Sequence, residues 1–65
     1  MKSFSVSAFF PEVKPAHAAF QRATAEAAEM NTAISRALSE IRERSAIKGK
    51  RITEVRLTVK QVSSD

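Results

Sequence analysis

The stretch that decides the predicted fold is Ala16–Ala46, which reads AHAAFQRATAEAAEMNTAISRALSEIRERSA. Its apolar side chains recur at alternating steps of three and four residues, at Phe20, Ala23, Ala27, Met30, Ile34, Ala37 and Ile41. This spacing aligns them in one stripe of an α-helix, and Leu38 widens the stripe. Because the interior holds no Gly or Pro and is rich in good helix formers, we predict one amphipathic helix over about residues 15–47.

A strand is predicted on each side of this helix. Residues 2–10 alternate between an apolar side (Phe4, Val6, Ala8 and Phe10) and serines, and Pro11 then removes a backbone donor and ends the strand. Residues 51–62 alternate in the same way, with Val55, Leu57 and Val59 on one side and Glu54, Arg56, Thr58 and Lys60 on the other.

The order strand, long helix, strand predicts an α+β fold made of a single β-α-β unit in one small domain, residues 1–65. The weakest point of the predicted helix is Asn31-Thr32, since both residues are poor helix formers and Asn is a good N-cap. The alternative is therefore a helix that breaks near Asn31 and folds back as a hairpin onto the sheet.

The predicted elements do not match in length, which favours association of several chains. A helix of about 30 residues is about 45 Å long, whereas strands of seven to nine residues reach only about 25–30 Å. A chain of 65 residues without Cys also has few other ways to stabilise a small core. We therefore expect a homo-oligomer, a dimer or larger, with the helix stripe as its interface: Phe20, Ala23, Ala27, Met30, Ile34, Leu38 and Ile41.

The net charge of +4 is concentrated in the C-terminal segment. Charges cancel within the predicted helix, but between Ile47 and Lys60 only Glu54 opposes the cations. Such a cluster attracts polyanions. The alternative is that Arg42, Arg44 and Lys48 only complement the negative end of the helix dipole. The candidate polyanion-binding residues are Lys48, Lys50, Arg51, Arg56 and Lys60.

Catalysis and metal binding find little support in the sequence. The carboxylates fall on predicted solvent faces or chain ends, and the single histidine, His17, has no partner that would make a proton relay. One glycine cannot form a phosphate-binding loop, and one His without Cys cannot form a zinc site. We therefore predict a protein that is not an enzyme, with no catalytic residue, no metal and no cofactor.

The sequence accordingly predicts a small, non-enzymatic, homo-oligomeric binding or regulatory module that contacts nucleic acid or another polyanion through its basic C-terminal strand. Since the chain has no Tyr or Trp, contacts would be mostly to the phosphate backbone. The alternative is a protein–protein interaction or scaffold module with no nucleic-acid role. A cytoplasmic location is expected, since the absence of Cys fits a reducing compartment. No membrane partner is expected, because no window approaches the roughly 18 apolar residues that a membrane span needs.

Overall fold

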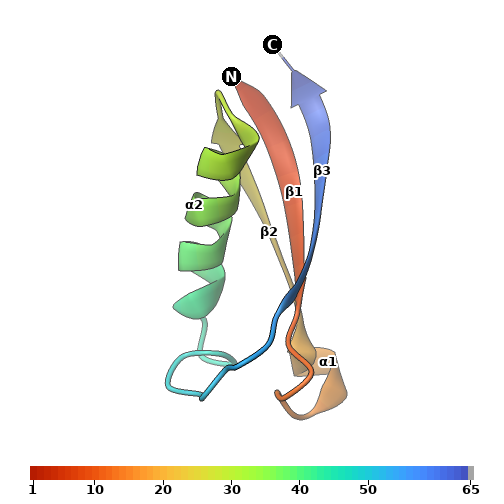
Figure 1. Cartoon of the computed structure of the whole chain (residues 1–65), viewed down its shortest axis with the longest axis vertical. Coiled ribbons are helices and arrows are strands. Elements are labelled where there is room, and N and C mark those ends of the chain that lie inside the picture. The colour runs from red at the N-terminus through yellow and green to blue at the C-terminus, as the bar shows by residue number, and fades with distance from the viewer. Residues whose placement is uncertain (65) are drawn as a thin grey trace.

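A computed structural model describes residues 1–64 and shows one antiparallel sheet with a helix on one face (Figure 1). The elements, in chain order, are β1 (Lys2–Phe9), α1 (Ala16–Ala19), β2 (Phe20–Ala27), α2 (Met30–Arg42) and β3 (Arg56–Ser64). The predicted α+β class is confirmed.

The first strand, β1, lies in the centre of the sheet, in the order β2-β1-β3. It pairs antiparallel with both neighbours, so that Phe9 lies opposite Phe20 on one side and Arg56 on the other. The β1–β3 register shifts once, between the pairs made by Ser3 and Phe4, where β3 holds an irregularity. Both outer strands therefore have one edge that no other strand of the described chain covers.

The core lies between the sheet and α2. Phe4, Val6 and Ala8 of β1 are buried, as their alternation predicts. On α2 the buried side chains are Ala33, Ala37 and Ile41, spaced at i, i+4 and i+8 on one helix face. Small residues on both surfaces, including the buried Ala23 and Ala27 of β2, allow α2 to lie close to the sheet.

The prediction of one long helix over residues 15–47 and only two strands is wrong. The first half of the predicted helix contains only one helical segment, the short α1. The rest of that half, Phe20–Ala27, is a strand that pairs with the whole of β1. The chain does turn close to the suspected weak point, since α2 begins at Met30, but the segment before the turn is a strand and not a second long helix. Strand pairing prevailed over helix propensity here, because β2 covers one edge of β1 and buries alanines beneath α2.

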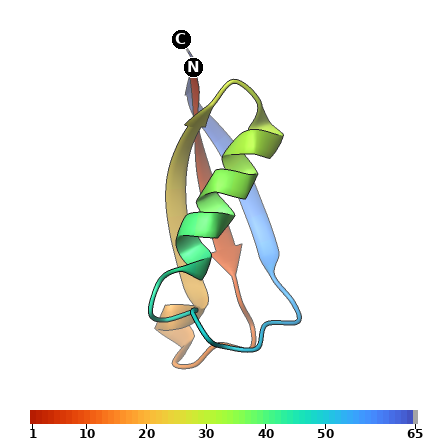
Figure 2. The same cartoon turned by 90° about the vertical axis from the view of Figure 1, so that its left-hand side faces the viewer.

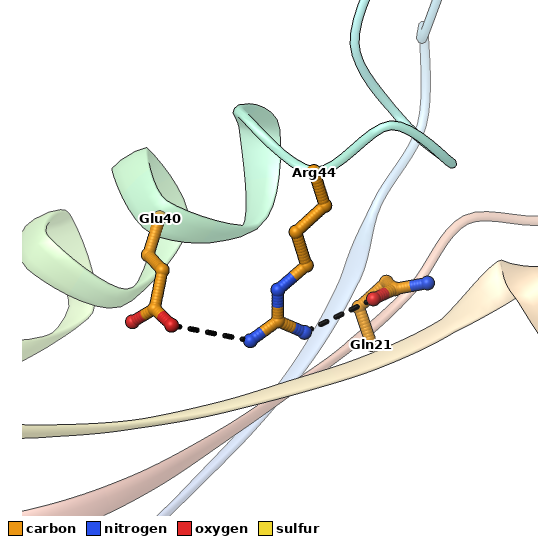
Figure 3. Close-up of polar contacts among 3 residues, drawn as sticks. All are labelled: Gln21, Glu40 and Arg44. Carbon is orange, nitrogen blue, oxygen red and sulfur yellow. Dashed lines mark hydrogen bonds and ion pairs between the residues drawn. The ribbon is translucent and has the colours of Figure 1, made fainter.

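The end of the helix also differs from the prediction. The last residue of α2 is Arg42, and Gly49 lies in a later turn, with a φ of 80° that favours glycine. Arg44 fixes the chain just after the helix, because its guanidinium donates hydrogen bonds to Gln21 Oε1 at 3.0 Å and to Glu40 Oε1 at 3.4 Å (Figure 3). The contact with Gln21 joins the end of α2 to β2.

The difference in length between helix and strands is thus resolved within one chain. The helix has 13 residues, and β1 and β2 have eight each, which makes each element about 20–27 Å long. The mismatch therefore no longer supports an oligomer, and only the surface of the folded chain can favour association.

Candidate functional site

No helix within residues 1–64 lies over the face of the sheet opposite α2, as the edge-on view of the sheet shows (Figure 1). We call it the open face. Strand alternation and the registers of the two pairings assign to it Ser3, Ser5, Ser7, Phe9, Phe20, Arg22, Thr24, Glu26, Arg56, Thr58, Lys60 and Ser63. Every one of these side chains is exposed or half-buried. The open face is thus a polar surface three strands wide.

Two phenylalanines form an aromatic pair at one end of the open face. Phe9 and Phe20 are cross-strand partners, and their ring centroids lie 4.7 Å apart with an interplanar angle of 38°. Phe9 is half-buried, whereas Phe20 is 66% exposed. An apolar ring this exposed contributes little to the core, and its face is available to a flat ligand.

Three cations lie on the two outer strands of this face. Arg22 is on β2, and Arg56 and Lys60 are on β3. Arg56 Nε lies 3.2 Å from Glu54 Oε2 in an ion pair with both side chains more than half exposed, a geometry that contributes about 1 kcal/mol at most. Within residues 1–64, no carboxylate lies within ion-pair distance of Arg22 or Lys60.

A row of serine hydroxyls runs between the cations. Ser5 lies between Thr24 and Lys60, and Ser7 lies between Arg22 and Thr58. A hydroxyl both donates and accepts hydrogen bonds and is small enough to leave the backbone accessible. In each of these cross-strand rows, short hydroxyl side chains therefore lie beside a longer cationic side chain. Both kinds of group can donate hydrogen bonds to phosphate oxygens.

The structure places the predicted polyanion-binding residues on two different sides of the molecule. Arg56 and Lys60 lie on the open face, whereas Lys48 and Lys50 line a groove of about 420 Å³ on the helix side, between the end of α2 and the segment before β3. Arg51 lies in the connecting loop, near the carboxylate of Glu12. The five cations thus do not form one continuous patch.

The helix-stripe residues predicted to form an oligomer interface are also dispersed. Ala23, Ala27 and Ile41 are buried in the core of this chain. Phe20 lies on the open face, while Met30 is 45% exposed at the start of α2. The remaining two residues, half-buried on α2, are Ile34 and Leu38.

Sequence reasoning missed Arg22 and the aromatic pair as parts of one surface, because it assigned Phe20–Ala27 to a helix. A signal was present: the polar residues Arg22, Thr24 and Glu26 alternate strictly with alanines. Strict alternation indicates a half-buried strand.

Glu12 holds the loop that leads into β3. Its Oε1 accepts hydrogen bonds from the backbone N–H groups of Thr53 at 2.7 Å and Glu54 at 2.9 Å. These hydrogen bonds, with that from Thr53 the largest cause, and the positive charge of Arg51 lower the pKa of Glu12 below its usual value of 4.5. The contact connects the turn after β1 to the residues just before Arg56.

Within residues 1–64, no group of three His, Asp or Glu side chains is arranged to hold a metal ion. None of the helices found there has the length and apolar character needed to cross a membrane. In comparisons with known proteins, no family model, curated protein or solved structure matches this chain. The open face is therefore the feature of this chain that points to a function.

Proposed function

We propose that this protein is a small, non-enzymatic module that binds single-stranded nucleic acid on the open face of its sheet and acts as a homo-oligomer. Arg22, Arg56 and Lys60 bind phosphates, the serine row donates hydrogen bonds, and the pair of Phe9 and Phe20 supports a base. The observation that carries the proposal is an uncovered sheet face that holds cations and an exposed aromatic ring together.

Folding alone gives no reason for this combination of residues. The open face contributes no side chain to the two buried clusters of the core apart from the partial contact of Phe9. Among residues 1–64, the three cations of this surface face the carboxylate of Glu26 and that of Glu54, which pairs with Arg56, so that the cations remain in excess. A local excess of positive charge attracts polyanions and speeds their association.

The shape of the surface favours a single strand over a duplex. Bases inside a duplex are stacked on each other and cannot stack on a protein ring, whereas the bases of a single strand can. The open face also lacks a protruding helix that would enter a major groove, because α2 lies on the opposite side of the sheet. Sheet surfaces that combine aromatic rings with cations suit an extended strand of a few nucleotides.

Recognition on this face would be weakly specific. Cations and hydroxyls contact the phosphates and sugars that all sequences share, and stacking tolerates any base. The expected result is binding that falls with salt, with a log–log slope of about −0.7 per phosphate contact for single strands. Three contacts per chain give a slope of about −2.

The proposal is tested by titrating labelled single-stranded DNA and RNA, and a duplex of the same sequence, between about 50 mM and 200 mM salt. The double variant Arg22→Ser/Lys60→Ser removes two of the three cations, so its slope should fall to about one third of the parent value and its affinity should fall similarly for all sequences.

A matched control removes the same charge from the other side of the molecule. The double variant Lys48→Ser/Lys50→Ser changes two residues on the helix side. Its affinity for single-stranded nucleic acid should stay within about twofold of the parent value, because salt screens long-range charge effects. Equal losses in the two double variants would show that the open face is not the site. No binding at low salt by the parent would leave the second candidate, a protein-interaction or scaffold module.

A further inference from the structure

The two outer strands of the sheet differ in how α2 covers them. The helix packs mainly over β2, less over β1, and barely contacts β3. Figure 2 shows α2 in front of β2 and β1, with β3 standing to one side. On its helix side β3 therefore lacks a covering layer, and its outer edge has no partner among residues 1–64.

Apolar side chains gather along this uncovered strip. Of the six large apolar residues among residues 1–64 that are 40% or more exposed, two lie along this strip, Val55 at 40% and Leu57 at 40%, and Val62, at 54%, lies at the irregularity of β3. The neighbouring side of α2 contributes the half-buried Ile34 and Leu38, and Leu38 and Val55 line the same groove. An unpaired strand edge next to apolar surface is a site where another strand adds.

We propose that a second copy of this chain covers this surface, with the β3 strands of the two copies paired antiparallel about a two-fold axis. This inference rests on the homo-oligomeric part of the proposed function and assigns its interface. A two-fold contact requires one patch that complements itself. The β3 edge meets that requirement, since it offers the same unpaired N–H and C=O groups and the same apolar strip to its copy.

The symmetry fixes how the two sheets join. For antiparallel strands in one sheet, the two-fold axis runs perpendicular to the sheet, so the helices of both copies lie on the same side. The two grooves then face each other across the paired strands, and Ile34 and Leu38 of each copy cover Leu57 and Val59 of both. One contact thus buries the apolar strip of each copy and forms a sheet of six strands.

The charges on β3 restrict the register. An axis at Lys60 would place the two Lys60 side chains directly opposite each other, and an axis at Thr58 would place Arg56 opposite the Lys60 of the other copy. Like charges in directly opposed positions are destabilising. An axis at Val59 avoids both, places Thr58 opposite Lys60 and Leu57 opposite Gln61, and uses the straight part of the strand before its irregularity.

This register has a consequence for the open face. Because both helices lie on the other side, the two open faces become one surface with β3 of each copy in its middle. Arg56 and Lys60 of the two copies then form a central group of four cations. The binding surface is therefore completed by the second copy.

The mass of the protein in solution, measured by light scattering at micromolar concentration without nucleic acid, tests the interface. The parent should have twice the chain mass of 7.2 kDa. Leu57→Glu places a charge in the proposed interface between the two β3 strands and should shift the mass to that of a monomer. The matched control, Thr24→Glu, places the same charge on β2 and should remain a dimer. A monomeric parent, or a dimer that Leu57→Glu leaves unchanged, would overturn the proposal.

A second measurement tests the same interface even if the Leu57→Glu variant does not fold. The chain has no cysteine, so one introduced thiol can report on one contact. If Val59 lies at the axis, the two Cα atoms are about 4.5–5.5 Å apart, within the range that a disulfide spans. Val59→Cys should therefore cross-link on mild oxidation, whereas Thr24→Cys should not. Equal cross-linking of the two variants would contradict the register.

These experiments are independent of ligand binding. A parent protein that is a dimer but does not bind DNA or RNA would support the interface and refute the nucleic-acid proposal. A monomer that binds them would refute the interface and support the nucleic-acid proposal. If both proposals hold, Leu57→Glu should also lower the salt slope for single-stranded DNA to about half of the parent value, since half of the cations are lost from the joined surface.

Discussion

The two faces of this sheet share a central strand and differ in almost every physical property. On the covered face, β1 presents Phe4, Val6 and Ala8, all buried under α2. On the open face, the residues between them are serines, half-buried and polar. The outer strand β2 follows the same division, with its alanines turned to the helix and Arg22 turned away.

The difference separates residues that the fold explains from those that it does not. Burial and close approach of α2 account for the apolar residues of β1 and the alanines of β2 on the covered face. On the open face, solvent contact explains polarity in general, but it does not explain an exposed phenylalanine on the same face as three cations. That residue combination is the reason to look for a ligand there.

Adjacent residues of β1 provide the strongest test of this comparison. Val6→Asp places a carboxylate in the core and should destabilise the fold by about 4 kcal/mol or more, enough to unfold a domain of this size. Ser7→Asp introduces the same group one residue later on the open face and should change stability by only about 0.5 kcal/mol. Urea unfolding followed by circular dichroism measures both, and similar losses would show that the open face is also buried.

A smaller effect is expected from added volume between α2 and the sheet. Ala37 has no exposed surface, so Ala37→Leu should overpack this contact and destabilise the fold by about 1–3 kcal/mol. Ser39→Leu adds a large side chain at an exposed position of the same helix and should be nearly neutral. Thermal unfolding of the two variants gives the comparison, and a neutral Ala37→Leu would mean that the helix does not lie close to the sheet.

The covered face could be predicted from sequence only in part. The alternation of β1 identified its buried residues correctly, and the second half of the helical stripe, with Ala37 and Ile41, is indeed on the buried side of α2. The alternation of β3 placed Arg56 and Lys60 on one side, as the register confirms. In each of these three segments, the spacing of the apolar residues fits the period of one kind of secondary structure and not that of the other.

The strand β2 escaped prediction for a specific reason. Ala23 and Ala27 are four residues apart, a spacing that keeps two residues on one side of both a helix and a strand. Alanine also has the highest helix propensity, so the alanine-rich composition of this segment favoured a helix. Ala25 and the polar residues that alternate with the alanines distinguish the two periods. Because the strand was not predicted, Phe20 and Arg22 were not assigned to the open face.

The aromatic pair gives the third prediction, which concerns binding. Phe20→Ala should weaken binding of single-stranded DNA by about 1–3 kcal/mol, the usual effect of losing one stacked base. It should leave the salt dependence unchanged, because no cation is removed. Met30→Ala, which trims an exposed apolar side chain at the start of α2, is the control and should bind as the parent does. A changed salt slope in Phe20→Ala would indicate that the ring positions a cation and does not stack.

The smallest effect should come from Glu12, which stabilises the loop before Arg56. Its pKa is lowered in the folded chain, chiefly by the hydrogen bond from the Thr53 N–H group. A lowered pKa means that the ionised form is favoured by folding, so the contribution is fully present above pH 4.5 and is lost as the pH falls through the folded pKa.

An NMR titration of the Thr53 and Glu54 amide protons tests this contact directly. Both signals should move toward loop values with a midpoint below pH 4.5, while amides in the centre of β1 stay unchanged. In Glu12→Gln the amide oxygen is a weaker acceptor that does not titrate, so the transition should disappear from both signals. Because Glu12 touches neither face of the sheet, this variant should bind nucleic acid as the parent does. A midpoint at or above 4.5, or a transition that persists in Glu12→Gln, would show that another group controls the loop.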